Sequence, residues 1–204
     1  MADPQHLIPH TALHAFITRS FVACGFPEED ADTAAGLMVK ADLMGQDGHG
    51  VFRLPMYIKR LRAGGLNPTP EFRCLEDRTA TALIDGDNGL GHLVMHHATQ
   101  LAIEKAKTTG VAWVGARHSN HAGPASLYAM MPLEHDMIGL YVAVGSANHL
   151  PPWGGTEMLL STNPIAVAVP SAKNPPIVLD MATTVAAYGK VKTAAQRGET
   201  MPEG

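Results

Sequence analysis

The chain has 204 residues, of which 46% are hydrophobic and 17% are charged, and its formal net charge is −4. This length suits one large domain, or one domain with a smaller helical piece, and the composition excludes a disordered chain. A negative net charge without a cluster of Lys and Arg disfavours binding to nucleic acid or to an anionic membrane. The sequence therefore predicts an ordered globular protein.

We expect neither a signal peptide nor a membrane span in this sequence. Two cysteines, Cys24 and Cys74, are too few for the disulfide framework of a small secreted protein. The first ten residues, MADPQHLIPH, lack the charged and apolar regions of a signal peptide. No run of about 18 apolar residues occurs, so no membrane span is predicted. We expect a soluble protein of the cytoplasm.

The first 70 residues predict a helical segment. Within residues 9–45, apolar side chains recur at helical spacing up to Gly25, and an acidic turn after Pro27 begins a second helix. The sequence Asn67-Pro68-Thr69-Pro70 then interrupts any regular element. We therefore expect a domain boundary here, which separates the N-terminal helical segment, residues 1–70, from the rest of the chain.

The most distinctive stretch follows the second helix. His49 comes directly after Gly48, and Arg53 and Tyr57 follow at four-residue steps. Pro55 restricts the local structure, since proline is tolerated only in the first turn of a regular helix. Either a helix begins near Arg53 with His49 on the preceding loop, or a longer helix is kinked. Both alternatives bring an imidazole, a guanidinium and a phenol to one helix N-terminus, which favours anions.

Strands alternate with helices after residue 70, which indicates an α/β domain over residues 71–204. Apolar runs bounded by turn residues predict strands at 81–85, 111–116, 138–144, 165–169 and 177–179. Helical patterns predict helices at 93–108, 125–133 and 186–196. The polar end from residue 197 leaves the β/α pattern without a last element, so we expect a domain that is incomplete at its C-terminus.

A glycine-rich turn at residues 86–91 has the spacing G-x-x-G-x-G, which is the reverse of the Rossmann dinucleotide fingerprint. No Walker lysine pattern occurs either. A plain structural turn is the favoured interpretation, and a Rossmann cofactor site is not predicted.

Histidines are numerous, with 11 in the chain. His92 and His96 lie four apart on an expected helix, and His118 and His121 lie three apart in an expected loop, spacings that can ligate zinc. Neither an HExxH motif nor a cysteine pair accompanies them, so no metal site is predicted. His92, His96 and His97 are expected to be surface or half-buried residues.

Two further positions are candidates for chemistry. The loop from His118 to His121 lies where a strand ends and a helix begins, an edge where α/β proteins often place their sites. Asp180 directly follows the apolar strand at 177–179. A carboxylate there either orients a catalytic histidine or caps the next helix, and the pattern leaves both alternatives open.

Four segments together resemble one family, the malate/L-lactate dehydrogenases of the second, non-Rossmann type. They are ADLMGQDGHGVFRLPMYIKRLRAGG, HSNHAG, PPWGGTEMLLSTNPIAVAVP and LDMATTVAAYGKV, which occur in the family's order between Ala41 and Val191. Its members include ureidoglycolate, sulfolactate and diketogulonate oxidoreductases and the piperideine/pyrroline carboxylate reductases. The resemblance implies a family-specific α/β fold with a mixed sheet and an N-terminal helical segment, in a homodimer whose subunits share active sites.

The resemblance also implies an NAD- or NADP-dependent oxidoreductase. It would interconvert a 2-oxo acid, or a cyclic imino acid, with the corresponding 2-hydroxy acid or amino acid by hydride transfer. His49 resembles the family's catalytic acid/base and Asp180 its carboxylate partner, while His121 resembles a histidine that some members are thought to use for proton transfer. Imidazole suits this task because its pKa lies near neutrality.

Other positions resemble the family's binding residues. Arg53 resembles the residue that grips the substrate carboxylate, and Tyr57, Gly48 and Thr162 resemble parts of the same pocket. The resemblance places no metal in the site. On the cofactor side it implies the residues His118, Ser126, Ser146, Asp180, Met181, Ala182, Thr183 and Thr184.

Two positions depart from the family pattern. Relatives usually have serine where this chain has Gly48, and often an aromatic residue where it has Ala122. The second difference predicts a roomier pocket that suits a substrate bulkier than lactate. Two other functions compete with the dehydrogenase: a catalytically silent fragment or binding module, and a metal-dependent hydrolase that uses the histidines.

Overall fold

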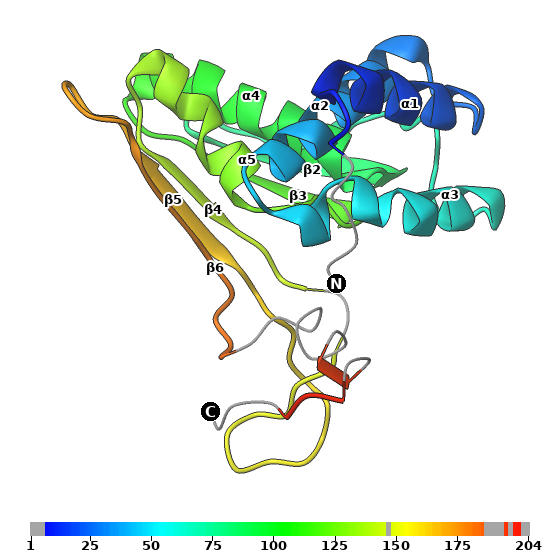
Figure 1. Ribbon diagram of the computed structural model, residues 1–204. Helices are drawn as coiled ribbons and strands as arrows, with labels where there is room; N and C mark the ends of the chain where they lie inside the picture. Colours follow the sequence, from blue (N-terminus) through cyan, green and yellow to red (C-terminus); the bar gives the residue numbers. More distant parts are fainter. Residues whose placement is uncertain (1–6, 146–147, 186–193, 196–197, 201–204) are drawn as a thin grey trace. The chain divides into compact units, whose positions relative to one another are not determined.

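The computed structural model describes residues 7–145, 148–185, 194–195 and 198–200 (Figure 1). Helices and two small sheets form the α/β fold that the sequence predicts. The chain divides into two compact units, residues 1–127 and 128–204. The domain boundary expected after Pro70 stays a prediction, and the helices before it share a hydrophobic core with Leu90 and Leu93.

Three helices begin the first unit, as the periodicity predicts for the first two: α1 (His10–Val22), α2 (Glu28–Leu43) and α3 (Leu54–Arg62). α2 starts after Pro27 with three acidic residues in its first turn, where carboxylates offset the helix dipole. Its small residues Ala31, Ala34 and Ala35 are fully buried, so α1 can pack closely against it. The first two helices therefore form a closely packed pair.

The segment between α2 and α3 consists of two 3₁₀ turns, η1 (Asp47–His49) and η2 (Val51–Arg53). Pro55 lies in the first turn of α3, where its missing N–H breaks no helical hydrogen bond. The structure therefore selects the first of the two sequence alternatives: His49 lies on the turn before the helix.

The sheet of the first unit is mixed, with β2 between an antiparallel β1 and a parallel β3. Helix α4 connects β2 to β3 and packs against both strands (Figure 1). It ends at Gly110, whose φ of 76° is the left-handed conformation that glycine adopts most easily. The bounds of these elements are β1 (Arg73–Asp77), β2 (Thr81–Gly89), α4 (Gly91–Thr109) and β3 (Trp113–Ser119).

For this sheet, one sequence expectation is wrong and one strand has no prediction. Residues 86–89 belong to β2, because Gly89 still pairs with Ser119 beyond an irregularity at which Asp87 and Asn88 have positive φ. β1 has no counterpart among the predicted strands. All five of its residues are exposed, so it lacks the apolar alternation that marks a half-buried strand.

The chain passes into the second unit through a short helix, α5 (Ser126–Ala129), which a 3₁₀ turn follows, η3 (Met131–His135). Together they replace the single helix expected at 125–133. Three antiparallel strands come next in the order β4 (Gly139–Val142), β5 (Ile165–Val169) and β6 (Ile177–Met181). The helix predicted at 186–196 falls mostly outside the described residues.

The two faces of the β4–β6 sheet differ in chemistry, because paired residues of neighbouring strands point to the same side. Tyr141, Ala166 and Asp180 are in register across the three strands and share one face. The opposite face is apolar, and Ile165 and most other members are exposed. Its members are Leu140, Val142, Ile165, Val167, Val169, Ile177, Leu179 and Met181.

Candidate active site

Residues that are far apart in the sequence meet beside the start of α3. His49 lies at the end of η1 and His121 follows β3, and their rings stack at 17° with centroids 5.7 Å apart. The hydroxyl of Tyr57, from the buried side of α3, lies 2.6 Å from Nδ1 of His121. The structure thus brings together three of the residues that the sequence singles out.

The turn that carries His49 is anchored to α2. The carboxylate of Asp42 accepts the backbone N–H of Val51 at 2.9 Å. Gly50 packs directly against this carboxylate, so a Cβ at position 50 would overlap it. Burial raises the pKa of Asp42, whereas the hydrogen bond from Val51 lowers it. Asp42 and Gly50 therefore determine the path of the backbone through His49.

Two guanidinium groups border the histidine pair. Nε of Arg53 donates to the carbonyl oxygen of Gly48 at 2.7 Å, which ties the guanidinium to the turn before α3. Nη1 of Arg60 donates to Oδ1 of Asn120 at 3.3 Å. These two positive charges next to two imidazoles make a region that attracts anions such as carboxylates.

His121 is an acceptor at Nδ1. The backbone N–H of Gly123 donates to this atom at 3.3 Å, and the hydroxyl of Tyr57 is hydrogen bonded to the same atom. Burial, followed by the charges of His49, Arg53 and Arg60, lowers the pKa of His121 to about 4. His121 is consequently neutral near pH 7.

His92 lies beneath this group on the first turn of α4. It is fully buried, and its ring meets the ring of Tyr57 edge to face at a centroid distance of 5.6 Å. Within the described part of the chain, neither of its ring nitrogens has a hydrogen-bond partner. Burial, and then the charges of His121 and His49, lower the pKa of His92 to about 3. The expectation of a surface or half-buried His92 is wrong, because this turn of α4 faces inward.

The other two histidines of α4 behave as expected, with His96 half-buried and His97 exposed. His118, which the resemblance places on the cofactor side, lies with its Nδ1 3.0 Å from the carboxylate of Asp85. The same carboxylate accepts from Arg117 at 3.3 Å. The backbone hydrogen bond from Asp87 is the main cause of the lowered pKa of Asp85, and His118 and Arg117 add to it.

Ser126 is fully buried. Its hydroxyl donates to Oε1 of Gln46 at 3.2 Å, which links the start of α5 to the turn before η1. The hydroxyl is thus engaged inside the first unit, and its predicted contact with a cofactor stays a prediction.

The second unit carries the remaining predicted residues. Asp180 lies on β6 and shares a sheet face with Tyr141 of β4. Burial, followed by the negative charge of Asp180, raises the pKa of Tyr141 to about 12. Ser146 lies outside the described residues.

The segment that follows β6 is hydrogen bonded to the segment before β5. The N–H and the hydroxyl of Thr183 donate to the carbonyl of Thr162 at 2.9 and 3.1 Å, and the hydroxyl also reaches the carbonyl of Asn163 at 3.2 Å. Residues 181–184 are exposed or half-buried. These bonds fix the segment after β6, and its predicted contact with a cofactor stays a prediction.

In the first unit, sequence reasoning missed Asp42 and Arg60, and in the second unit it missed Tyr141 beside Asp180. Arg60 extends the predicted Arg53 and Tyr57 pattern by about one turn, which was a usable signal. Asp42 bonds to a residue nine positions away, and no spacing rule marks such a contact.

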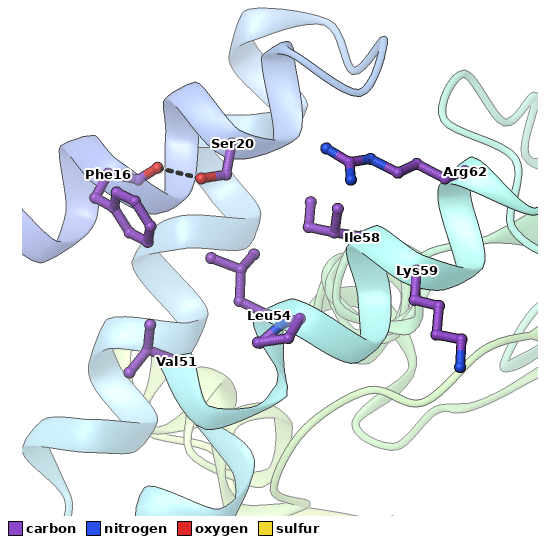
Figure 2. A pocket seen from close by; sticks show the side chains of 8 residues that line it. Phe16, Ser20, Val51, Leu54, Ile58, Lys59 and Arg62 are labelled. Atoms are coloured by element: carbon purple, nitrogen blue, oxygen red, sulfur yellow. Dashed lines mark hydrogen bonds between the residues drawn. The ribbon is translucent and has the colours of Figure 1, made fainter.

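A groove between α1 and α3 has a volume of about 510 Å³. Figure 2 shows Phe16 of α1 facing Leu54 and Ile58 of α3, with Arg62 at the rim. Its lining, as far as the structure describes the chain, contains no histidine and no carboxylate. Leu54, three residues before Tyr57, lies near the same face of α3 as that tyrosine, and Ile58 lies about 100° further around the helix.

Among the described residues, no group of three or more His, Cys, Asp or Glu side chains is arranged to hold a metal ion. None of the helices in the same part of the chain combines the length and apolar character that crossing a membrane requires.

Comparison with known proteins identifies relatives over nearly the whole chain. The malate dehydrogenase of Pyrococcus horikoshii is 45% identical over 197 residues, which are 97% of this chain and 54% of that protein. The L-sulfolactate dehydrogenase of Methanocaldococcus jannaschii is 43% identical over 88% of this chain and 52% of its own length. The chain thus spans about half the length of the curated relatives it matches.

Solved structures agree with this relationship. The P. horikoshii malate dehydrogenase structure superimposes with a TM-score of 0.88 over 94% of this chain and 55% of that one, at 44% identity. The M. jannaschii sulfolactate dehydrogenase gives a TM-score of 0.91 over 98% and 57%, at 40% identity. The family model described as malate/L-lactate dehydrogenase matches residues 8–204. This chain belongs to the malate/L-lactate dehydrogenase family.

Proposed function

We propose that the protein is an NAD(P)-dependent oxidoreductase that interconverts a 2-oxo acid, or a cyclic imino acid, with the reduced 2-hydroxy acid or amino acid. The observation that carries this proposal is the stacked pair of His49 and His121 beside the guanidinium of Arg53. It joins a group that transfers protons to a group that binds carboxylates. The names of the relatives, which are malate, sulfolactate and ureidoglycolate dehydrogenases, support the same reaction class.

Substrate binding is assigned to Arg53. A guanidinium can bind a planar carboxylate through two parallel hydrogen bonds, which fixes the orientation of the adjacent carbonyl group. The bond from its Nε to the carbonyl of Gly48 restrains the side chain before any substrate arrives. Gly48 and Thr162 stay proposals as further pocket residues.

Proton transfer is assigned to His49. When bound, a nicotinamide cofactor supplies or accepts the hydride. The carbonyl oxygen of a 2-oxo acid must gain a proton as the carbon is reduced, and the imidazolium of His49 can give it. His121 is held neutral and therefore acts as a hydrogen-bond donor toward the substrate.

On the second unit, Asp180 is proposed as the carboxylate that supports the acid/base residue, on the strength of the family resemblance. The cofactor side is proposed at residues 181–184, which are exposed or half-buried, on the strength of the family resemblance. His118, Ser126 and Ser146 stay proposals from the resemblance alone.

We also propose a cytoplasmic homodimer with shared active sites. The exposed apolar face of the β4–β6 sheet supports an assembly, since such a face gains free energy when it leaves water. Cys24 and Cys74 are both free, which suits a reducing compartment. Sedimentation equilibrium of the full-length protein tests the dimer.

The activity is tested by mixing the full-length protein with NADH or NADPH and a panel of 2-oxo acids and cyclic imines. Loss of the absorbance of the reduced nicotinamide is the expected result. Comparing its rate with NADH and with NADPH shows which of the two cofactors the enzyme uses. His49→Ala should abolish turnover while cofactor binding persists. Absence of turnover with every pair, together with a folded wild-type protein, would instead support the binding-module alternative.

A further inference from the structure

Tyr57 does more than line a pocket. We propose that it is a positioning residue whose hydroxyl, together with the backbone N–H of Gly123, holds His121 as the neutral imidazole with its proton on Nε2. His121 then offers one fixed N–H to a substrate oxygen, and His49 alone exchanges a proton. The part of this inference that concerns substrate rests on the proposed function. The protonation state of His121 does not.

The first argument is the direction of the two hydrogen bonds at Nδ1. A backbone N–H has no acceptor capacity, so the 3.3 Å contact from Gly123 requires a lone pair on Nδ1. The phenol of Tyr57, 2.6 Å away, must then donate to the same atom. Two donors on one nitrogen exclude a proton there, and the neutral ring must carry its proton on Nε2.

The second argument is that Tyr57 cannot easily leave this position. The side chain is 1% exposed, and the ring of His92 packs edge-on against its ring. Burial raises the pKa of Tyr57 against the opposing effect of Arg53 and Arg60, so the phenol keeps its proton. The donor is therefore fixed in place and in protonation state.

The third argument concerns charge. The titratable and charged groups that face His121 are His49 on the turn before α3, Tyr57, Arg53 and Arg60, and His92 of α4 is coupled to it. The positive ones among them oppose a second proton on His121. Protonation at Nδ1 would also break the hydrogen bond from the N–H of Gly123 and require the Tyr57 hydroxyl to reverse from donor to acceptor. Geometry and charge thus favour the same neutral form.

Nitrogen-15 NMR of histidine-labelled full-length protein tests this state directly. In the wild type, His121 should show a non-protonated, hydrogen-bonded Nδ1 and a protonated Nε2 throughout pH 6 to 8. A protonated Nδ1 in the wild type would overturn the proposal, whatever any variant does.

Tyr57→Phe tests the role of the phenol. Loss of one donor to the neutral form should raise the pKa of His121 by about one unit, because a hydrogen bond has a net value near a tenfold change in equilibrium. The nitrogen-15 chemical shift of Nδ1 should move toward the value of a non-protonated nitrogen that accepts no hydrogen bond. The acid limb of the kcat/KM profile should shift to higher pH in parallel. Tyr128→Phe is the matched control: Tyr128 is as buried as Tyr57, but its ring packs against Tyr141.

The outcomes separate the two proposals. If the wild type turns over and a folded Tyr57→Phe variant keeps the wild-type Nδ1 resonance and pH profile, Tyr57 does not position His121. If the wild type does not turn over but its His121 has the expected tautomer, the proposed function fails and this inference stands. If Tyr57→Phe fails to fold, the wild-type nitrogen-15 spectrum alone decides whether His121 carries its proton on Nε2.

Discussion

The backbone N–H of Val51 donates to the carboxylate of Asp42 over 2.9 Å, and this single bond ties the end of α2 to the turn that carries His49. Asp42→Ala should therefore destabilise the protein by about 1–3 kcal/mol and lower kcat, because it leaves a partly buried N–H without its acceptor. Asp42→Asn keeps an oxygen acceptor and should recover most of the stability. Thermal melts and turnover of both variants measure the effect.

Asp32→Ala removes an exposed carboxylate of the same helix, which lies 3.7 Å from Nε2 of His14, and serves as the control for charge removal. If Asp42→Ala and Asp32→Ala have the same melting temperature and kcat, the bond to Val51 contributes nothing to the turn.

Gly50→Ala should be far more damaging than Gly48→Ala, although the two glycines flank the same histidine. A Cβ at position 50 would overlap the Asp42 carboxylate, whereas a Cβ at position 48 meets nothing within 4 Å. We expect Gly50→Ala to lower turnover at least tenfold and Gly48→Ala to fold normally, and melting curves with steady-state kinetics check this. Equal behaviour of the two variants would mean that the turn relaxes freely around His49.

Arg53→Lys should raise KM for the acid substrate by roughly tenfold or more with a smaller effect on kcat, because a lysine cannot form two parallel hydrogen bonds to a carboxylate. It also loses the Nε donor that binds the carbonyl of Gly48. Arg62→Lys at the exposed end of the same helix is the control. An unchanged KM in Arg53→Lys would place the carboxylate elsewhere.

His92 should make the protein sensitive to acid. Its folded-state pKa of about 3 lies below the ordinary value of 6.5, so between these two values the unfolded state binds more protons than the folded state. The free energy of unfolding should therefore fall as the pH decreases from 6.5 toward 3. In His92→Leu this fall should be shallower, as measured by denaturant unfolding at several pH values.

The control for that experiment is His97→Leu, which removes an exposed histidine of the same helix and leaves His92 in place. Its slope against pH should match that of the wild type. A slope that is unchanged in His92→Leu would show that other groups are responsible for the acid sensitivity.

The sequence predicted well the features that depend on local spacing. Helical periodicity located α1 and α2, and Pro55 restricted the start of α3 to two alternatives, of which the structure has one. Steps of four residues placed Arg53 and Tyr57 on neighbouring turns beside His49. Ile165–Val169 was predicted with its correct bounds because five apolar residues lie between turn residues.

Features that depend on tertiary packing escaped prediction. His92 begins a helix whose inward face is set by the sheet beneath it, so no pattern within the helix marks its burial. The strand β1 is an exposed edge strand, which forms because it pairs with β2. The bond between Tyr57 and His121 joins residues 64 positions apart, and spacing alone cannot show such a contact.

Helix α3 makes contacts on two adjacent faces. Tyr57 reaches the histidines, and on the adjacent face Leu54 and Ile58 line the groove of Figure 2 together with Phe16. A helix of nine residues cannot shift on one side alone. We therefore expect a substitution at Phe16 of α1, a residue that lines only the groove, to disturb the position of the Tyr57 phenol through the helix they share as a neighbour.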